Sequence, residues 1–296
     1  LVADEHSGTA AARNTDNVYT LPLANYDPAL RYFIVVDIKG TKSSDKPMNR
    51  RGCNGDVTFG RDREPGLPLP KLPLLPVTAD EAARHRGPNF AGEGVRVGVV
   101  QGGYGSEALL THLRAAADVQ AQPLYHLIPD FIGRCEVVVL TQGRVAESFP
   151  AAAVAPLEEF VRGGGGLLTT HDAVGFRGLP VLCAEVCAGG LDKVRDKNWR
   201  VSAEHPVTAG LPRDTALALG YYDFISVTPG PAGTAVAVGD PSAVPAVVCG
   251  AFGEGRYVAC GIGIGIGGTG AEETPPTAPE STLLLNAINW LAGAGG

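Results

Sequence analysis

Alternation of short apolar runs with helical segments, from Val95 onward, is the feature that most limits how this chain can fold. Val95–Val100 is an almost uncharged run, and it is followed by a glycine turn and by leucines at helical spacing. Further strands are predicted over 123–128, 136–140 and 167–170, and helices over 106–118 and 150–162. Strand and helix alternating at this spacing favour parallel βαβ units. We therefore expect an α/β domain over 95–296 with a mostly parallel sheet flanked by helices.

The C-terminal part of the chain carries a different strand pattern. Apolar runs at 235–238, 246–249 and 256–260 predict three more strands, and Gly253-Glu254-Gly255 predicts a hairpin between the last two. The sheet is therefore expected to end in antiparallel strands. Residues 281–291 carry leucines and isoleucine at helical spacing and predict a closing amphipathic helix.

Residues 1–94 lack this alternation. The β-branched and aromatic run 32–38 predicts a strand, prolines spaced through 65–76 favour an extended path, and Thr78-Ala-Asp-Glu81 resembles a capping box. The segment holds too little apolar periodicity for a core of its own. We predict a partly extended, Pro-rich N-terminal arm that packs on the following domain or on a neighbouring subunit.

Charge and composition exclude some classes of function. The net charge is −7 and Lys and Arg form no run, so the electrostatic footprint of a nucleic-acid-binding protein is missing. A mildly acidic surface fits a small neutral or cationic ligand. No apolar stretch reaches the roughly 18 residues needed to span a membrane. The chain begins at Leu1 rather than Met, so export to the periplasm or the exterior is one hypothesis for an otherwise unknown compartment.

The six cysteines do not form the pattern of a small disulfide scaffold. Cys183 and Cys187 are one helical turn apart, as in half of a zinc site, but no second pair follows at zinc-finger spacing. Buried free thiols are the expectation.

Four segments in a fixed order resemble the ThuA-like (trehalose utilisation) branch of the class I glutamine-amidotransferase-like superfamily. They are 95–105, a strand with a glycine turn; 160–171, FVRGGGGLLTTH; 204–212, EHPVTAGLP; and 245–258, PAVVCGAFGEGRYV. The resemblance covers about the last two-thirds of the chain. It implies a flavodoxin-like, glutamine-amidotransferase-like fold and a carbohydrate-related small molecule as ligand or substrate.

The chain departs from that pattern at three places. Thr170-His171-Asp172 stands where an amidotransferase carries its nucleophilic Cys, so glutamine hydrolysis by that route is not expected. Tyr221-Tyr222-Asp223-Phe224 replaces Asp-Glu-x-Tyr, and the glycine-rich run 261–268 replaces a Gly-His pair. An active site carried over from the family would therefore be incomplete.

Polar residues that follow the predicted strands are the candidate site, because ligands of open α/β sheets bind outside the carboxyl ends of the strands. His171 is the candidate general base and Asp172 its orienting partner. The alternative is that His171 is a hydrogen-bonded residue at a strand end and His205 a structural turn residue. The predicted ligand-binding residues are Gln101, Gly102, Gly103, Gln142, Tyr222 and Asp223.

A divalent metal is the one cofactor considered. His171, His205 and Asp223 would supply its ligands if the fold brought them together. Residues 263–268 fit G-x-G-x-x-G, but acidic residues and prolines follow where a helix would be needed, so a dinucleotide site is rejected in favour of a flexible or close-packed segment. The turn 102–106 could bind an anion through backbone N–H groups.

Two hypotheses for function follow. One is a protein that binds or acts on a carbohydrate-related small molecule at the strand ends. The other is a non-catalytic structural protein, a homo-oligomer or part of a larger assembly, that keeps the fold and contacts neighbouring subunits through its N-terminal arm. The missing nucleophile and the long arm favour the second, and the sequence leaves both open.

Overall fold

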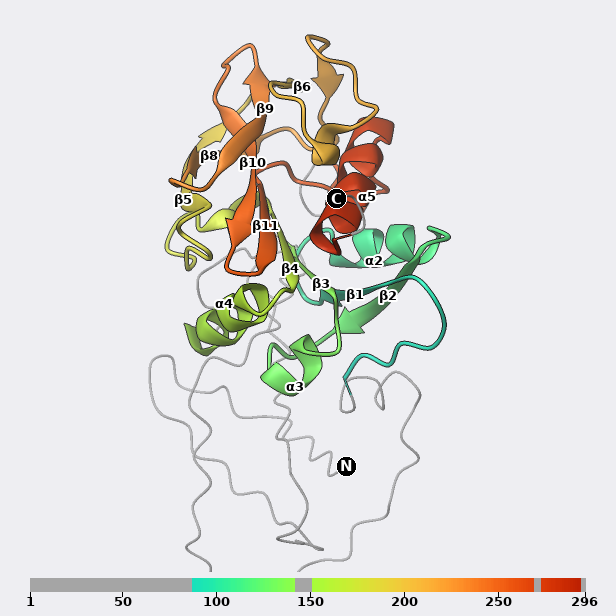
Figure 1. The fold of residues 1–296 in the computed structure, drawn as a ribbon. Helices are drawn as coiled ribbons and strands as arrows, with labels where there is room; N and C mark the ends of the chain where they lie inside the picture. The colour runs from blue at the N-terminus through green and yellow to red at the C-terminus, as the bar shows by residue number, and fades with distance from the viewer. Residues whose placement is uncertain (1–86, 142–150, 269–272, 294–296) are drawn as a thin grey trace, which may run out of the picture.

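A computed structural model describes residues 87–141, 151–268 and 273–293 (Figure 1). Its centre is a nine-stranded sheet in the order β2-β1-β3-β4-β11-β10-β9-β6-β7. The strands are β1 (Val95–Val100), β2 (Val119–Leu124), β3 (Val137–Leu140), β4 (Gly166–Thr170), β6 (Asn198–Val201), β7 (Leu217–Ala218), β9 (Thr234–Asp240), β10 (Pro245–Phe252) and β11 (Gly255–Cys260). β5 (Cys187–Val194) and β8 (Phe224–Pro229) form a second, two-stranded antiparallel sheet.

The expectation of a flavodoxin-like, mostly parallel sheet flanked by helices was wrong. Strands β2, β1, β3, β4 and β11 pair in parallel, but β11–β10, β10–β9, β9–β6 and β6–β7 are all antiparallel, so the sheet is mixed. The physical reason lies in the connections. A parallel pair needs a crossover of a dozen or more residues, whereas β9, β10 and β11 follow one another through short turns.

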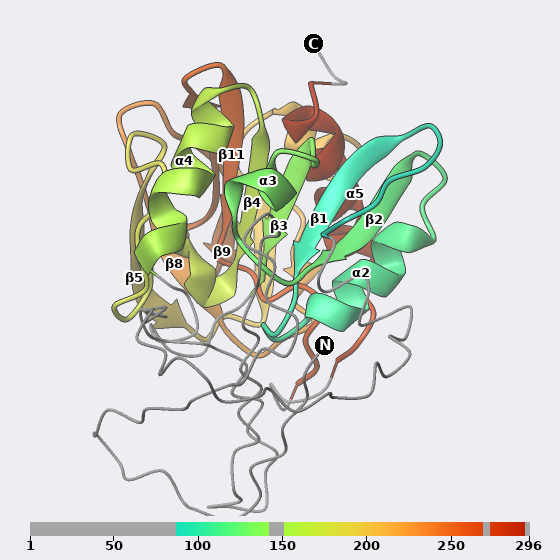
Figure 2. The same ribbon diagram turned by 90° about the horizontal axis from the view of Figure 1, so that it is seen from below.

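Few helices cover this sheet. They are α2 (Ser106–Arg114), α3 (Pro129–Ile132), α4 (Val154–Arg162) and α5 (Ala278–Leu291), with the 3₁₀ turns η2 (Ala151–Ala153), η3 (His171–Val174) and η4 (Pro206–Thr208). Figures 1 and 2 show α3 and α4 on one face of the parallel half and α5 on the other. Among the described residues, no helix combines the length and the apolar character that crossing a membrane requires.

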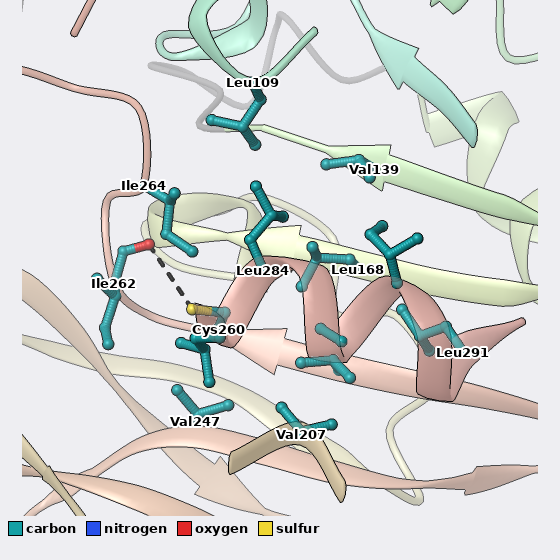
Figure 3. Close-up of a cluster of buried hydrophobic side chains, with 14 of the residues drawn as sticks. Leu109, Val139, Leu168, Val207, Val247, Cys260, Ile262, Ile264, Leu284 and Leu291 are labelled. Atoms are coloured by element: carbon teal, nitrogen blue, oxygen red, sulfur yellow. Dashed lines mark hydrogen bonds between the residues drawn. The ribbon is translucent and has the colours of Figure 1, made fainter. Parts of the chain in front are cut away.

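Two apolar clusters fill the two faces of the sheet. On one face Leu109 of α2 and Leu284 of α5 pack with Val139 and Leu168 of the central strands (Figure 3). On the other face Leu157 of α4 belongs to the cluster that also holds Phe131 of α3 and Tyr257 of β11. Because side chains alternate along a strand, consecutive buried residues of β3 and β4 serve opposite clusters, which is why β3 is apolar throughout and β4 carries two consecutive leucines.

The sequence predicted most of these elements. The strands at 95–100, 136–140, 167–170, 235–238, 246–249 and 256–260, the hairpin and the closing helix are confirmed. The prediction of a strand over 123–128 was mostly wrong, because β2 shares only residues 123 and 124 with it, and α2 is shorter than predicted. The predictions for 32–38, 65–76 and the capping box at 78–81 lie outside the described residues.

Candidate functional site

A buried charge network stands where β4 ends. His171 Nε2 lies 2.8 Å from Asp223 Oδ1, and Lys193 Nζ donates to Asp223 Oδ2 at 3.3 Å. The side chain of His171 is fully buried, that of Asp223 is 1% exposed, and that of Lys193 is 32% exposed. The sequence had placed His171 and Asp223 in the site, and the structure brings these two together.

Three segments far apart in the chain position this network. His171 is the first residue of η3, directly after β4, and its φ of 49° lies in the left-handed region, which is uncommon for residues other than Gly. Asp223 precedes β8, which is joined to the segment after β11 by the hydrogen bond from Ile225 N to Gly261 O at 2.9 Å. Lys193 comes from β5, where it is paired with Ile225 of β8.

The charged groups of the network shift one another's pKa values. Burial disfavours the imidazolium of His171, but the nearby Asp172 carboxylate and the hydrogen-bonded Asp223 carboxylate outweigh it and raise the pKa of His171 above its usual range. Burial also disfavours ionised Asp223, yet His171 and Lys193 hold the pKa of Asp223 below its usual range. Asp223 and Asp172 therefore favour the protonated form of His171, and the general-base role that the sequence suggested stays a prediction.

Two tyrosines border the network. The ring of Tyr221 contacts His171 edge-on, with centroids 5.4 Å apart, and Tyr222 is tilted against Tyr221 at 4.3 Å. Tyr221 is buried, whereas Tyr222 is 48% exposed. Of the two, Tyr222 is the aromatic face open to solvent.

Five buried polar atoms without a hydrogen-bond partner gather at the carboxyl ends of three adjacent parallel strands. Gln101 directly follows β1, and Thr141 directly follows β3. β4 ends at Thr170 and is followed by His171 and Asp172. The atoms are Gln101 Oε1, Thr141 Oγ1, Thr170 Oγ1, His171 Nδ1 and Asp172 Oδ1. We call this set the strand-end row.

The register of the sheet explains why the row is continuous. Val99 of β1 is opposite Val139 of β3, and Leu140 of β3 is opposite Thr169 of β4. Carried one or two residues further, the same register sets Gln101 opposite Thr141 and Thr141 opposite Thr170. Val99, Val139 and Leu168 belong to the apolar cluster on the face that carries α2 and α5. Gln101, Thr141 and Thr170 each stand two residues further along the same strand direction, so their side chains are directed to that same face.

The glycine turn after β1 meets a group of the chain itself. Gly105 N donates to Glu273 Oε1 at 3.0 Å and Ala108 N to Glu273 Oε2 at 2.8 Å. The carboxylate thus occupies the N-terminus of α2, where the sequence had suggested an anion site. Gly102, with a φ of 97°, and Gly103 shape the turn after Gln101.

His205 lies elsewhere in the fold. Its Nδ1 accepts a hydrogen bond from Val207 N at 3.2 Å and its ring packs edge-on against Trp290. Trp290 O accepts from Arg256, which is paired with Gly166 at the start of β4, whereas His171 follows the end of that strand. In the part of the chain that the structure describes, no three His, Cys, Asp or Glu side chains are grouped to hold a metal.

The remaining predicted features are Gln142, the glycine-rich run 261–268 and the cysteines. Gln142 lies outside the described residues. The glycine-rich run is close-packed, as predicted: Gly265, at a φ of 81°, packs against α2 so closely that an added Cβ would lie 2.2 Å from Leu109 Cδ1. Five of the cysteines are described, and all five are buried free thiols. Lys193 had no sequence signal, because it lies in a strand rich in glycine and charged residues.

Comparison with known proteins agrees with this fold. No protein-family model and no curated protein matches the sequence. Among solved structures, a protein of Bacteroides uniformis described as ThuA-like matches with a TM-score of 0.51 at 17% identity, over 69% of this chain and 94% of that one. A protein of Salmonella typhimurium described as cytoplasmic matches with a TM-score of 0.50 at 18% identity, over 67% of this chain and 99% of that one. The chain therefore has the ThuA-like fold.

Proposed function

We propose that this ThuA-like domain binds a hydroxyl-rich, carbohydrate-related small molecule at the carboxyl ends of β1, β3 and β4. The observation that carries the proposal is the strand-end row. A buried polar atom without a partner costs roughly 1–3 kcal/mol. Five such atoms on neighbouring strands make a cluster whose cost a polar ligand would remove by hydrogen bonding.

The chemistry of the row matches hydroxyl groups better than other ligand groups. Gln101 Oε1 and Asp172 Oδ1 accept, His171 Nδ1 donates when the imidazole is protonated, and the two threonine hydroxyls do both. A sugar hydroxyl also donates and accepts, so one ring with several hydroxyls can pair with all of these atoms. The half-exposed ring of Tyr222 offers an apolar face on which the C–H surface of a sugar can pack.

The position of the row supports the same proposal. Ligands of open α/β sheets bind beyond the carboxyl ends of their parallel strands, and β1, β3 and β4 are parallel neighbours. Asp172 gives the row contact with solvent, because its side chain is 12% exposed while that of His171 is fully buried. Gln101, directly after β1, is partly exposed as well.

The proposal is one of binding, with no chemical step assigned. In this role His171, when protonated, is a hydrogen-bond donor fixed by Asp223. The hypothesis of an assembly protein depends on the predicted arm, 1–94, of which 1–86 lies outside the described residues, and it stays a prediction.

Two adjacent threonines of β4 supply the test. Thr170 belongs to the row, whereas the hydroxyl of Thr169, on the opposite face, is bonded to Tyr257 at 2.8 Å. Thr170→Val and Thr169→Val remove the same group one residue apart. Thermal unfolding and calorimetric titration of both variants and the wild type, with glucose, galactose, trehalose and myo-inositol, form the experiment.

At least one of these compounds is expected to raise the melting temperature of the wild type and of Thr169→Val, and to lose about tenfold in affinity for Thr170→Val, since one hydrogen bond contributes roughly 1.4 kcal/mol. Without ligand, Thr170→Val is expected to be as stable as the wild type or more stable. A compound that binds Thr170→Val and the wild type equally would contradict the proposal. So would the absence of binding by all four compounds to either protein.

A further inference from the structure

We infer that the strand-end row selects uncharged polyhydroxy ligands and excludes their carboxylated and phosphorylated counterparts, and that Asp172 is the residue that selects. The inference rests on the proposed function and adds a prediction about the charge of the ligand. It follows from how the charged groups around the row are already paired.

The cations of the network face Asp223. His171 Nε2 is 2.8 Å from Asp223 Oδ1, and Lys193 Nζ is 3.3 Å from Asp223 Oδ2. Both carboxylate oxygens of Asp223 are thus engaged from two sides. A cation that already lies at hydrogen-bond distance from a buried counter-ion attracts a second anion weakly. The reason is that the fields of the two opposite charges largely cancel at a distance.

Asp172 is paired less closely than Asp223. Its Oδ1 lies 3.8 Å from His171 Nδ1, beyond hydrogen-bond distance, and each of these two buried atoms is without a hydrogen bond. The carboxylate can therefore accept a hydrogen bond from a ligand that carries a proton to donate. It is the anion that a ligand in the row must contact.

One hydroxyl group can satisfy both atoms at once. An oxygen about 2.8 Å from each fits between two atoms that are 3.8 Å apart. It would accept from His171 Nδ1–H and donate its own proton to Asp172 Oδ1. An ionised carboxylate or phosphate could accept from the imidazole but has no proton for Asp172, and it would place like charges a few ångströms apart in a site largely shielded from water.

Matched pairs of sugars that differ only in charge test this inference. Glucose against glucuronate and galactose against galacturonate keep the ring and replace one CH₂OH by a carboxylate. Titration calorimetry at pH 7 measures both members against the wild type, Asp172→Asn and Asp192→Asn. Asp192 is exposed on β5, so its variant makes the same chemical change outside the row.

The wild type and Asp192→Asn are expected to bind the neutral member of a pair at least tenfold more tightly than the acid. Asp172→Asn is expected to bind the neutral sugar several-fold more weakly and the acid more tightly, so that the ratio falls to within threefold. A melting curve of Asp172→Asn without ligand checks that the variant folds.

The outcomes separate the inference from the proposed function. If the wild type binds a neutral sugar through Thr170 but binds its acid equally well, or if Asp172→Asn keeps the tenfold ratio, the inference is wrong and the proposed function stands. If no member of either pair, and neither trehalose nor myo-inositol, binds the wild type, both are overturned. Binding of the acid alone would also overturn the inference.

Discussion

The carboxylate of Glu280 accepts a hydrogen bond from the backbone N–H of Gly220 at 2.8 Å, across sixty positions of the chain. The same carboxylate accepts from Thr277 N at 2.9 Å and completes the capping box of α5. Glu280 is 1% exposed. One buried side chain thus ties the start of the last helix to the turn that leads into Tyr221 and Asp223.

Loss of this carboxylate should destabilise the whole domain. We expect Glu280→Ala to lower the free energy of unfolding by about 1–3 kcal/mol, because it leaves the N–H groups of Gly220 and Thr277 without their acceptor. Urea unfolding followed by circular dichroism measures the change. Glu254→Ala, at an exposed position of the β10–β11 turn, is the control and should stay within about 0.5 kcal/mol of the wild type. Equal effects of both substitutions would contradict the role given to Glu280.

The stability of the domain should fall as pH rises through the raised pKa of His171. A histidine whose folded-state pKa lies above its unfolded value of about 6.5 stabilises the fold fully below that value, and the contribution is lost as pH rises past the folded pKa. His171→Asn should flatten this part of the profile, and Asn tolerates the left-handed backbone at this position better than most residues. Unfolding free energies from pH 5 to 9 test it; parallel profiles for the two proteins would refute the assignment.

The positive charge of Lys193 should lower the pKa values of Asp223 and His171. Removing its positive charge by Lys193→Met takes away a group that favours ionised Asp223 and should move the titrations of Asp223 and His171 to higher pH. NMR titration of the side-chain carboxyl and imidazole signals detects both shifts. Because Lys193 is about one-third exposed, the loss of stability should be small, on the order of 1 kcal/mol or less. A downward shift of the His171 midpoint would contradict this prediction and indicate instead that Lys193 holds Asp223 against His171.

Glu273 should stabilise α2 as an anion and also resist ionisation. Burial raises the pKa of Glu273, while hydrogen bonds from Ala108 and Gly105 oppose that rise. Glu273→Ala removes the acceptor at the helix N-terminus and is expected to cost about 1 kcal/mol. Glu273→Gln keeps the hydrogen-bonding oxygen and should cost less. Hydrogen exchange of the Gly105 and Ala108 amides locates the effect, and unchanged protection in Glu273→Ala would count against it.

The sequence revealed the parallel half of the sheet because buried strands such as β3 are continuous apolar runs between helices. It did not reveal β5, whose glycines and charged residues carry no periodic pattern. His171 and Asp223 were found from strand ends and family-like motifs, but their pairing depends on how β8 docks beside the segment after β11, a long-range contact that no local pattern encodes. Thr170 was passed over because a threonine at a strand end looks ordinary until its hydroxyl is found buried without a partner.

The position of β11 between β4 and β10 has a consequence for how the protein is made. β4 leaves the ribosome about ninety residues before its neighbour β11, so for several seconds of synthesis its backbone N–H and C=O groups line an open, apolar edge. Open edges of this kind invite pairing with other chains. The nascent chain is therefore most prone to aggregate before Gly255–Cys260 emerges, and a ribosome that stalls within β5 to β10 would release a protein whose central strand has no neighbour on one side.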